Sequence, residues 1–229
     1  GTNMTFNESS IENLTLELLE KAGFGYVSPE ALEPERPDLS QVVLRGRLAA
    51  AIGKLNPDLA EEVVQFAVNE VLRTATLTDN VIENNRAMHR LLTEGVQVEM
   101  LQDGHMRGRA VRVIDWETIS NNDLISTNQF YIKGLDRDKI PDVVLFVNGL
   151  PLVVIELKDA KNEDATVHKA FIQLKNYQKA IPDLFAYNGL LVISDGLDAR
   201  TGTITSGWDR FLSWKSIDGT RDANRTTPQ

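Results

Sequence analysis

Two carboxylates and an ammonium group stand at the same end of two neighbouring apolar segments in this chain. Asp142 opens the apolar run 143–147, and the next apolar run ends at Glu156, with Lys158 two residues further on. Carboxylates held against an apolar sheet need water, a cation or a proton to offset their lost hydration. The simplest chemistry for this trio is a divalent metal site with a lysine beside it, which is the core of a site that hydrolyses phosphodiesters.

The Asn148-Gly149 dipeptide between the two runs predicts a β-hairpin. A two-residue Asn-Gly loop favours a type I′ turn, and counting back from it places Asp142 across from Ile155, one residue from Glu156. A small bulge or the twist of the sheet would bring the two carboxylates together. Glu156 and Lys158 are two residues apart in a strand, so their side chains share a face.

We expect Asp142 and Glu156 to ligate Mg²⁺ or Mn²⁺, since these hard ions take oxygen ligands and retain waters. Lys158 would position or help to deprotonate a water bound to the metal, or stabilise charge on the phosphate. An E-x-K triplet by itself is usually a solvated strand end, and Asp142 by itself is compatible with a turn after Pro141. The combination of all three residues with the hairpin is what favours a metal site.

Composition sets limits on the function. The chain has 229 residues, of which 42% are hydrophobic and 25% charged, which is ordinary for a globular protein with a packed core. Cysteine is absent, which excludes disulfides and thiolate zinc sites and suits the cytoplasm. No apolar run approaches the roughly 18 residues of a membrane span, so we expect no membrane partner. The net charge of −9 argues against broad, unaided binding of nucleic acid.

Hydrophobic periodicity predicts a helical first half and a sheet-bearing second half. The helices are expected at about 8–19 (capped by Asn7 or Ser9), 40–54, 58–75, 79–92 and 165–180. The strands are expected at 96–100, 110–114, 128–132, 143–147, 152–157 and 190–194. The two runs of the hairpin lack alternation, so both of their faces should be covered. We predict an α/β fold with a mixed central sheet flanked by helices.

The hairpin and its surroundings resemble a known family. Pro141-Asp142 followed by Glu156-Leu157-Lys158 is similar to the PD-(D/E)xK nuclease motif. The wider pattern resembles the N-terminal nuclease domain of the R (restriction) subunit of type I restriction–modification enzymes. Matching stretches lie at 92–96, 121–123, 128–130, 141–158, 184–188 and 191–196. The resemblance covers roughly residues 92–218, and the helical residues 26–91 match less distinctively.

The resemblance implies a restriction-endonuclease-like fold. Residues 1–218 would form a single nuclease domain, with a helical part at about 8–92 and a catalytic core at about 93–218. Residues 219–229 would be a linker or a disordered tail towards a helicase-like motor outside this chain. No Walker A sequence occurs here, so ATP would bind only in that motor.

Two further site features follow from the resemblance. Gln173 and Tyr177 are four residues apart on a predicted helix and share a face; the resemblance to recombination-type nucleases implies that they help to hold DNA. The alternative is a surface pair with Tyr177 packed on the sheet. Related nucleases add an acidic residue from the first helix to the metal site, which points to Glu12 first and to Glu8 second; the alternative is a solvated helix residue.

The implied activity is that of a type I site-specific deoxyribonuclease. It would cut double-stranded DNA with Mg²⁺, after ATP-driven translocation, in a complex with methyltransferase and specificity subunits. Two alternatives stay open: a non-catalytic docking module of the same fold, and a recombination or repair nuclease of the same superfamily. The intact Asp142, Glu156 and Lys158 argue against the docking module.

Several other features can be interpreted as structural rather than functional. The three histidines are too scattered for a metal cluster. The lysines after the hairpin are either a phosphate-facing side or a solvated helix face: Lys161, Lys169, Lys175 and Lys179. Trp208, Phe211 and Trp214 are expected in the core or on a domain-docking surface rather than as base-stacking platforms.

Overall fold

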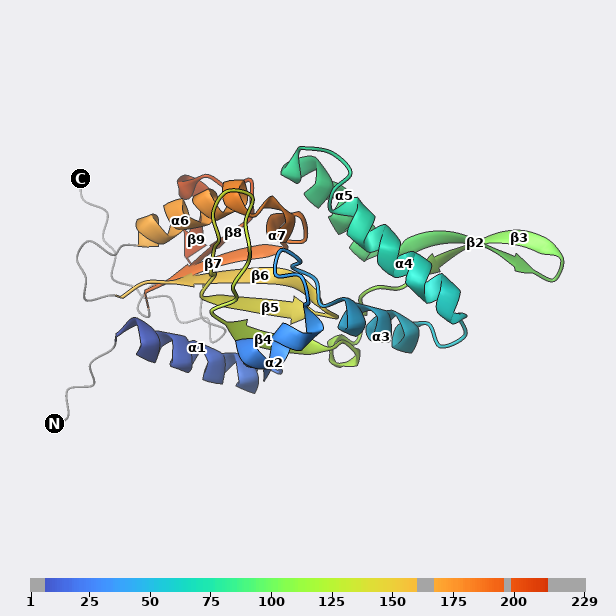
Figure 1. The fold of residues 1–229 in the computed structure, drawn as a ribbon, viewed down its shortest axis with the longest axis horizontal. Coiled ribbons are helices and arrows are strands. Elements are labelled where there is room, and N and C mark those ends of the chain that lie inside the picture. The colour runs from blue at the N-terminus through green and yellow to red at the C-terminus, as the bar shows by residue number, and fades with distance from the viewer. Residues whose placement is uncertain (1–6, 160–166, 196–198, 214–229) are drawn as a thin grey trace.

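A mixed β-sheet with helices on both faces is the centre of the molecule (Figure 1). The computed structural model describes residues 7–159, 167–195 and 199–213. In this part the strand order is β1-β4-β5-β6-β7-β8-β9. The bounds are Gly25–Tyr26 (β1), Leu124–Asn128 (β4), Val143–Val147 (β5), Leu150–Leu157 (β6), Leu190–Ser194 (β7), Ala199–Gly202 (β8) and Leu212–Ser213 (β9). The pairs β1–β4 and β6–β7 are parallel and the others antiparallel, which confirms the predicted mixed sheet.

Helices bury both faces of the central hairpin. Helix α1 (Glu8–Lys21) lies on one face, where Ile11 and Leu16 pack against alternate residues of β5 and β6. Helices α6 (Val167–Ala180) and α7 (Pro182–Ala186) cover the other face (Figure 1). The absence of polar alternation in both strands follows from this two-sided burial, as predicted.

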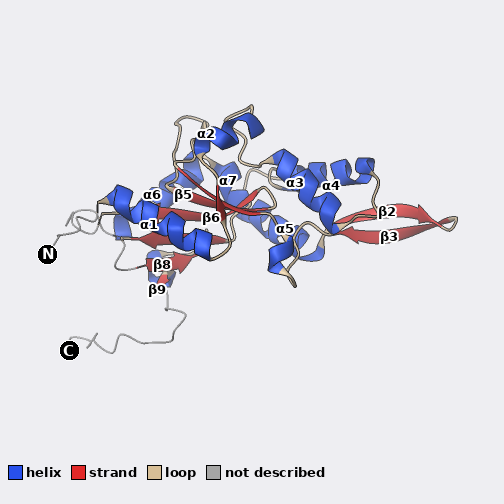
Figure 2. Ribbon diagram, turned by 90° about the horizontal axis from the view of Figure 1, so that it is seen from below, coloured by secondary structure: helices blue, strands red, loops and turns tan. Residues whose placement is uncertain are grey.

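A helical layer and a projecting arm lie beside the sheet (Figures 1 and 2). The layer contains α3 (Arg45–Leu55), α4 (Glu61–Thr74) and α5 (Val81–Glu94), and α5 packs against α7. The arm is a separate antiparallel pair, β2 (Val96–Gln102) and β3 (His105–Val111). The shorter helix α2 (Pro29–Leu32) and the 3₁₀ turns at Glu33–Glu35, Ile119–Asn121 and Trp208–Arg210 were not predicted, nor were α7 and the strands β1, β8 and β9.

Three predicted elements need correction. The expected strand at 110–114 is displaced: β3 spans His105–Val111, because the mostly exposed residues of the arm carry no apolar alternation that would mark a strand. The expected helix at 40–54 begins only at Arg45, because the Leu44 amide donates to the Gly149 carbonyl at 2.9 Å instead of continuing a helical turn. The expected strand at 128–132 is wrong: β4 ends at Asn128 because Gln129 has a φ of 47°. The apolar alternation there belongs to a loop anchored by buried side chains, Phe130 and Ile132. The start of the helix expected from 165 and the tail at 219–229 lie outside the described residues.

The hairpin turn is as predicted, and of the two expected ways to bring the carboxylates together, bulge or twist, the structure has the bulge. Asn148 and Gly149 have φ angles of 52° and 78°, which is typical of a type I′ turn. The pairing shifts by one residue between Phe146 and Leu145, which leaves Leu152 as the extra residue of β6. Val143 therefore pairs with Ile155, and the next position along the ladder sets Asp142 opposite Glu156.

The turn end of the hairpin is fastened by side chains. Asn148 is fully buried; its amide donates to the Val113 carbonyl at 2.8 Å and to Asn122 Oδ1 at 2.9 Å, and its Oδ1 accepts from the Asp123 amide at 2.7 Å. Asn122 in turn donates to the Asp115 carbonyl at 2.8 Å. Asn148 therefore does more than form the turn, because it ties the hairpin to the preceding loop.

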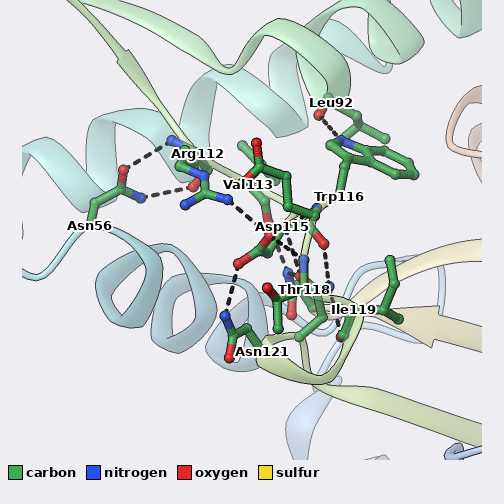
Figure 3. Close-up of polar contacts among 12 residues, drawn as sticks. Asn56, Leu92, Arg112, Val113, Asp115, Trp116, Thr118, Ile119 and Asn121 are labelled. Atoms are coloured by element: carbon green, nitrogen blue, oxygen red, sulfur yellow. Dashed lines mark hydrogen bonds and ion pairs between the residues drawn. The ribbon is translucent and has the colours of Figure 1, made fainter.

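That loop is ordered around the Asp115 carboxylate (Figure 3). The carboxylate accepts from the Thr118 amide and from the Asn121 side chain, each at 2.9 Å, and pairs with Arg112 at 3.0 Å. These contacts, the Thr118 hydrogen bond foremost, lower the pKa of Asp115 to about 2. Trp116 Nε1 donates to the Leu92 carbonyl at 2.8 Å. The base of the arm is thus held at the turn end of the hairpin, away from Asp142 and Glu156.

Gly149→Ala should destabilise the protein by roughly 2–5 kcal/mol, measured by urea unfolding. An added Cβ would overlap the Leu44 carbonyl oxygen and lie 2.9 Å from the Leu48 amide nitrogen, in a backbone with positive φ. Gly104→Ala is the matched control: Gly104 has nearly the same φ (77°) but lies in open space, so its substitution should cost only about 1 kcal/mol. Equal losses for both variants would contradict the packing explanation.

Candidate active site

Asp142 and Glu156 converge at the end of the hairpin opposite the turn. Asp142 is 8% exposed and Glu156 is fully buried. Asp142 Oδ2 accepts a hydrogen bond from the Leu157 amide at 2.7 Å, which holds this carboxylate against β6. Lys158 Nζ lies 3.8 Å from Glu156 Oε1. The bulge at Leu152 therefore brings the three side chains together as the hairpin geometry predicted.

Burial makes both carboxylates reluctant to ionise. Desolvation, and then the charge of Asp142, raises the pKa of Glu156 to about 9, against the opposing effect of Lys158. Desolvation also raises the pKa of Asp142. Glu156 Oε2 is buried without a hydrogen-bond partner. A buried carboxylate oxygen without a donor is rare and needs a proton or a cation, so these residues fit a divalent metal.

A chain of hydrogen bonds links Lys158 to α6 and back to Glu156. Lys158 Nζ donates to Gln173 Oε1 at 2.6 Å, and Gln173 Nε2 donates to the Tyr177 hydroxyl at 2.6 Å. The Tyr177 hydroxyl lies 3.5 Å from Glu156 Oε1. Burial, and then the Glu156 charge, raises the pKa of Tyr177, so this phenol stays protonated. Tyr177 is buried on the sheet, as one of the two interpretations expected, and it also contacts the site. A role of Gln173 and Tyr177 in holding DNA stays a prediction.

Glu12 is held by two amides beside this group. Its Oε1 accepts from Asn128 Nδ2 at 2.6 Å and its Oε2 from Gln129 Nε2 at 2.7 Å. Within the described residues, no three histidine, aspartate or glutamate side chains are grouped closely enough to hold a metal ion. Glu12 as a third ligand stays a prediction.

Glu8 interacts electrostatically with the site, although the sequence ranked it below Glu12. Its pKa is raised by burial first and then by Asp142, and lowered by Lys158. The amides of Asn128 and Gln129 were missed as partners of Glu12. The stretch 128–130 matched the family pattern. Because a strand was expected there, the turn at Gln129 that presents its side chain to Glu12 was not predicted.

Two of the histidines, and the C-terminal aromatic residues that the structure describes, make structural contacts. His89 Nε2 contacts the Asn188 carbonyl at 2.8 Å, and the His168 ring packs edge-on against Trp208. Phe211 is buried in the core and Trp208 packs against it, as expected. Trp214 and Lys161 lie outside the described residues.

The fold and the site together define an α/β domain with two buried carboxylates and a lysine at one end of its central hairpin. Residues 5–210 match the family model described as Type I restriction enzyme R protein N terminus. The chain therefore belongs to this family, which confirms the resemblance seen in the sequence.

Curated relatives are named as endonuclease subunits of type I restriction enzymes. The chain is 40% identical over 220 residues to the type I restriction enzyme HindI endonuclease subunit of Haemophilus influenzae, covering 93% of this chain and 20% of that protein. It is 34% identical over 220 residues to the putative type I restriction enzyme MjaIXP endonuclease subunit of Methanocaldococcus jannaschii, covering 93% and 21%. The chain thus spans about a fifth of the length of these relatives.

Across the described residues, no helix combines the length and apolarity needed to cross a membrane.

Proposed function

We propose that this chain is the DNA-cleaving module of a type I restriction enzyme R subunit, with a PD-(D/E)xK site that hydrolyses phosphodiesters of double-stranded DNA and depends on Mg²⁺ or Mn²⁺. The observation that carries this function is the unpartnered Oε2 of Glu156, buried beside Asp142 and close to Lys158. The relatives named as endonuclease subunits support it.

Asp142 and Glu156 would hold the metal. Mg²⁺ is usually bound through one or two carboxylates and keeps several waters, so two ligands from this chain suffice. When bound, the ion would lower the pKa of a water and neutralise charge developing on the phosphate. The Leu157 amide holds Asp142 in place for this role, since it occupies Oδ2 at 2.7 Å.

Lys158 would act on the substrate side of the carboxylates. Its ammonium carries three N–H donors, of which one is engaged by Gln173. Gln173 in turn is oriented by Tyr177, so the side-chain amide sets the direction of the ammonium group. A second donor of Lys158 can then hold the attacking water or stabilise the phosphate as its charge builds up. In the family's terms, Gln173 and Tyr177 also hold the DNA.

The other activities of such an enzyme would lie outside this chain. ATP binding and translocation would belong to the motor region of a longer subunit. Its partners would be a methyltransferase and a specificity subunit. The complex would act in the cytoplasm. A recombination or repair nuclease would use the same residues but would cut DNA as an isolated module. A docking module would need no metal.

Calorimetry with Mn²⁺ tests the site. The chain should bind Mn²⁺, and Asp142→Ala and Glu156→Ala should each bind it at least ~10-fold more weakly. Each variant removes a direct ligand, and even the loss of a residue that only supports a ligand lowers metal affinity by about 10–100-fold. Glu12→Ala decides whether that residue is a third ligand.

Glu17→Ala is the control, since Glu17 is an exposed carboxylate on the same helix as Glu12. Undiminished binding by the Asp142 and Glu156 variants, or no binding by the wild type, would rule out this metal site and favour the docking module.

A further inference from the structure

A cleft opens directly beside the catalytic group. Its volume is about 510 Å³, and it lies between one face of α6 and the loop that leads into β5. Gln173 and Tyr177 line it, and these are the residues that contact Lys158 and Glu156. The cleft therefore adjoins the candidate active site through these two side chains.

The α6 wall of the cleft is a single helical stripe. The lining residues of this helix recur at spacings of three and four, which places them on one face: Lys169, Ile172, Gln173, Asn176 and Tyr177. The side chains of Lys169 and Asn176 are exposed, and Ile172 is 46% exposed. Ala170 and Leu174 point into the core instead. The stripe thus presents polar and half-exposed apolar groups to the cleft.

Both walls contribute a lysine. Lys169 comes from α6 and Lys139 from the loop, whereas Asp138 is the one acidic residue among the described lining residues. Lys139 Nζ lies 5.7 Å from the centre of the Tyr177 ring. In a chain of net charge −9, this cleft is a local exception.

The structure also separates the lysines of α6 from one another. Lys175 donates to the Ile204 carbonyl at 2.8 Å and packs over Phe171, so it serves the core side of the helix. Lys179 is exposed but is not among the lining residues. Lys169 is therefore the described lysine of this helix that faces the cleft.

We propose that this cleft takes the phosphate backbone of the DNA strand next to the scissile phosphate, with Lys139 and Lys169 binding phosphates from the two walls and Asn176 donating a hydrogen bond. This assignment rests on the proposed nuclease function. Lysine and asparagine side chains are common phosphate contacts, and such contacts position DNA without reading its sequence. Ile172 and Ile140 offer apolar surface to the sugars between the phosphates.

The first test measures binding of a fluorescent duplex by anisotropy in EDTA, so that the metal site plays no part. The double variant Lys139→Ala/Lys169→Ala should bind at least ~10-fold more weakly than the wild type. The slope of log K against log salt should become shallower by about 1.8, which is two contacts at about 0.9 each. The charge-matched control Lys21→Ala/Lys179→Ala should leave affinity and slope nearly unchanged.

A second test uses the absence of cysteine from the chain. Asn176→Cys carries a single thiol that can be labelled with benzophenone maleimide and irradiated with a labelled duplex. Crosslinking should be at least ~5-fold stronger than for Lys179→Cys on the same helix. Equal crosslinking at the two positions, none at either, equal affinity of the two double variants, or no binding by the wild type would overturn the proposed cleft.

Failure of the cleft and failure of the nuclease are distinguishable. Mn²⁺ calorimetry on Lys139→Ala/Lys169→Ala should match the wild type, because neither lysine is a metal ligand. If the double variant bound both Mn²⁺ and DNA like the wild type, only the assignment of the cleft would be excluded. If the chain bound DNA through the two lysines but bound no Mn²⁺, the cleft would be supported as a DNA site and the proposed nuclease function would be excluded.

Discussion

Lys158→Ala in the full-length R subunit, assembled with its partner subunits, should reduce DNA cutting by at least ~100-fold while ATP hydrolysis continues. Removing one preorganised donor from a site where charge builds up typically costs about 10²–10³ in rate. Lys158 Nζ lies 3.8 Å from the buried carboxylate of Glu156. The motor would lie in a different part of the subunit, so its ATPase should be unaffected. Cleavage of a plasmid and release of phosphate are measured in the same reaction.

Two further variants locate the effect. Gln173→Ala leaves the ammonium in place but removes the 2.6 Å contact that orients it, so cutting should fall less than for Lys158→Ala, by roughly 10-fold. Lys179→Ala on the same helix should cut normally. Cutting by Lys158→Ala at the wild-type rate would exclude the lysine from the reaction, and joint loss of cutting and ATP hydrolysis would indicate a defect of assembly.

Glu156→Gln should stabilise the metal-free chain at pH 8 by about 2–4 kcal/mol. The folded-state pKa of Glu156 is raised to about 9, above the ordinary value of 4.5 that the unfolded chain has. Between these two pH values the folded protein binds more protons than the unfolded one, so stability falls as pH rises. One pKa unit corresponds to about 1.4 kcal/mol, and relaxation of the site reduces the full shift. The neutral amide removes this dependence.

Urea unfolding of both proteins in EDTA, at pH 5 and pH 8, checks the sign. The two should be close at pH 5, where Glu156 is protonated in the folded chain, and diverge at pH 8. Added Mn²⁺ should reverse the order at pH 8, because a ligand stabilises the form that binds it and Glu156→Gln lacks one ligand. If the variant were less stable than the wild type at pH 8 in EDTA, burial of the Glu156 carboxylate would not destabilise the folded chain, and the prediction would be wrong.

Local patterns were sufficient for most of the core of this protein. The type I′ turn at Asn148-Gly149 was predictable because both positions require positive φ, and the strand 190–194 because a short apolar run between polar residues has few alternatives. A bulge was considered only because the two carboxylates would otherwise lie one residue out of register, and its position at Leu152 was not predicted. The errors fell where contacts between residues far apart in sequence decide the backbone, as at Leu44, whose backbone amide donates to the Gly149 carbonyl.

By itself, the sequence determined the family, the mixed α/β fold and the placement of Asp142, Glu156 and Lys158 at one end of a hairpin. These follow from residue types at short spacing, which the chain carries whatever surrounds it. The tertiary structure alone decided that Glu156 is fully buried with an unpartnered oxygen, that Gln173 holds Lys158, and that Lys169 rather than Lys175 faces the cleft. Desolvation and side-chain contacts depend on the packing of α6 against the sheet, and that packing joins residues that no short pattern connects.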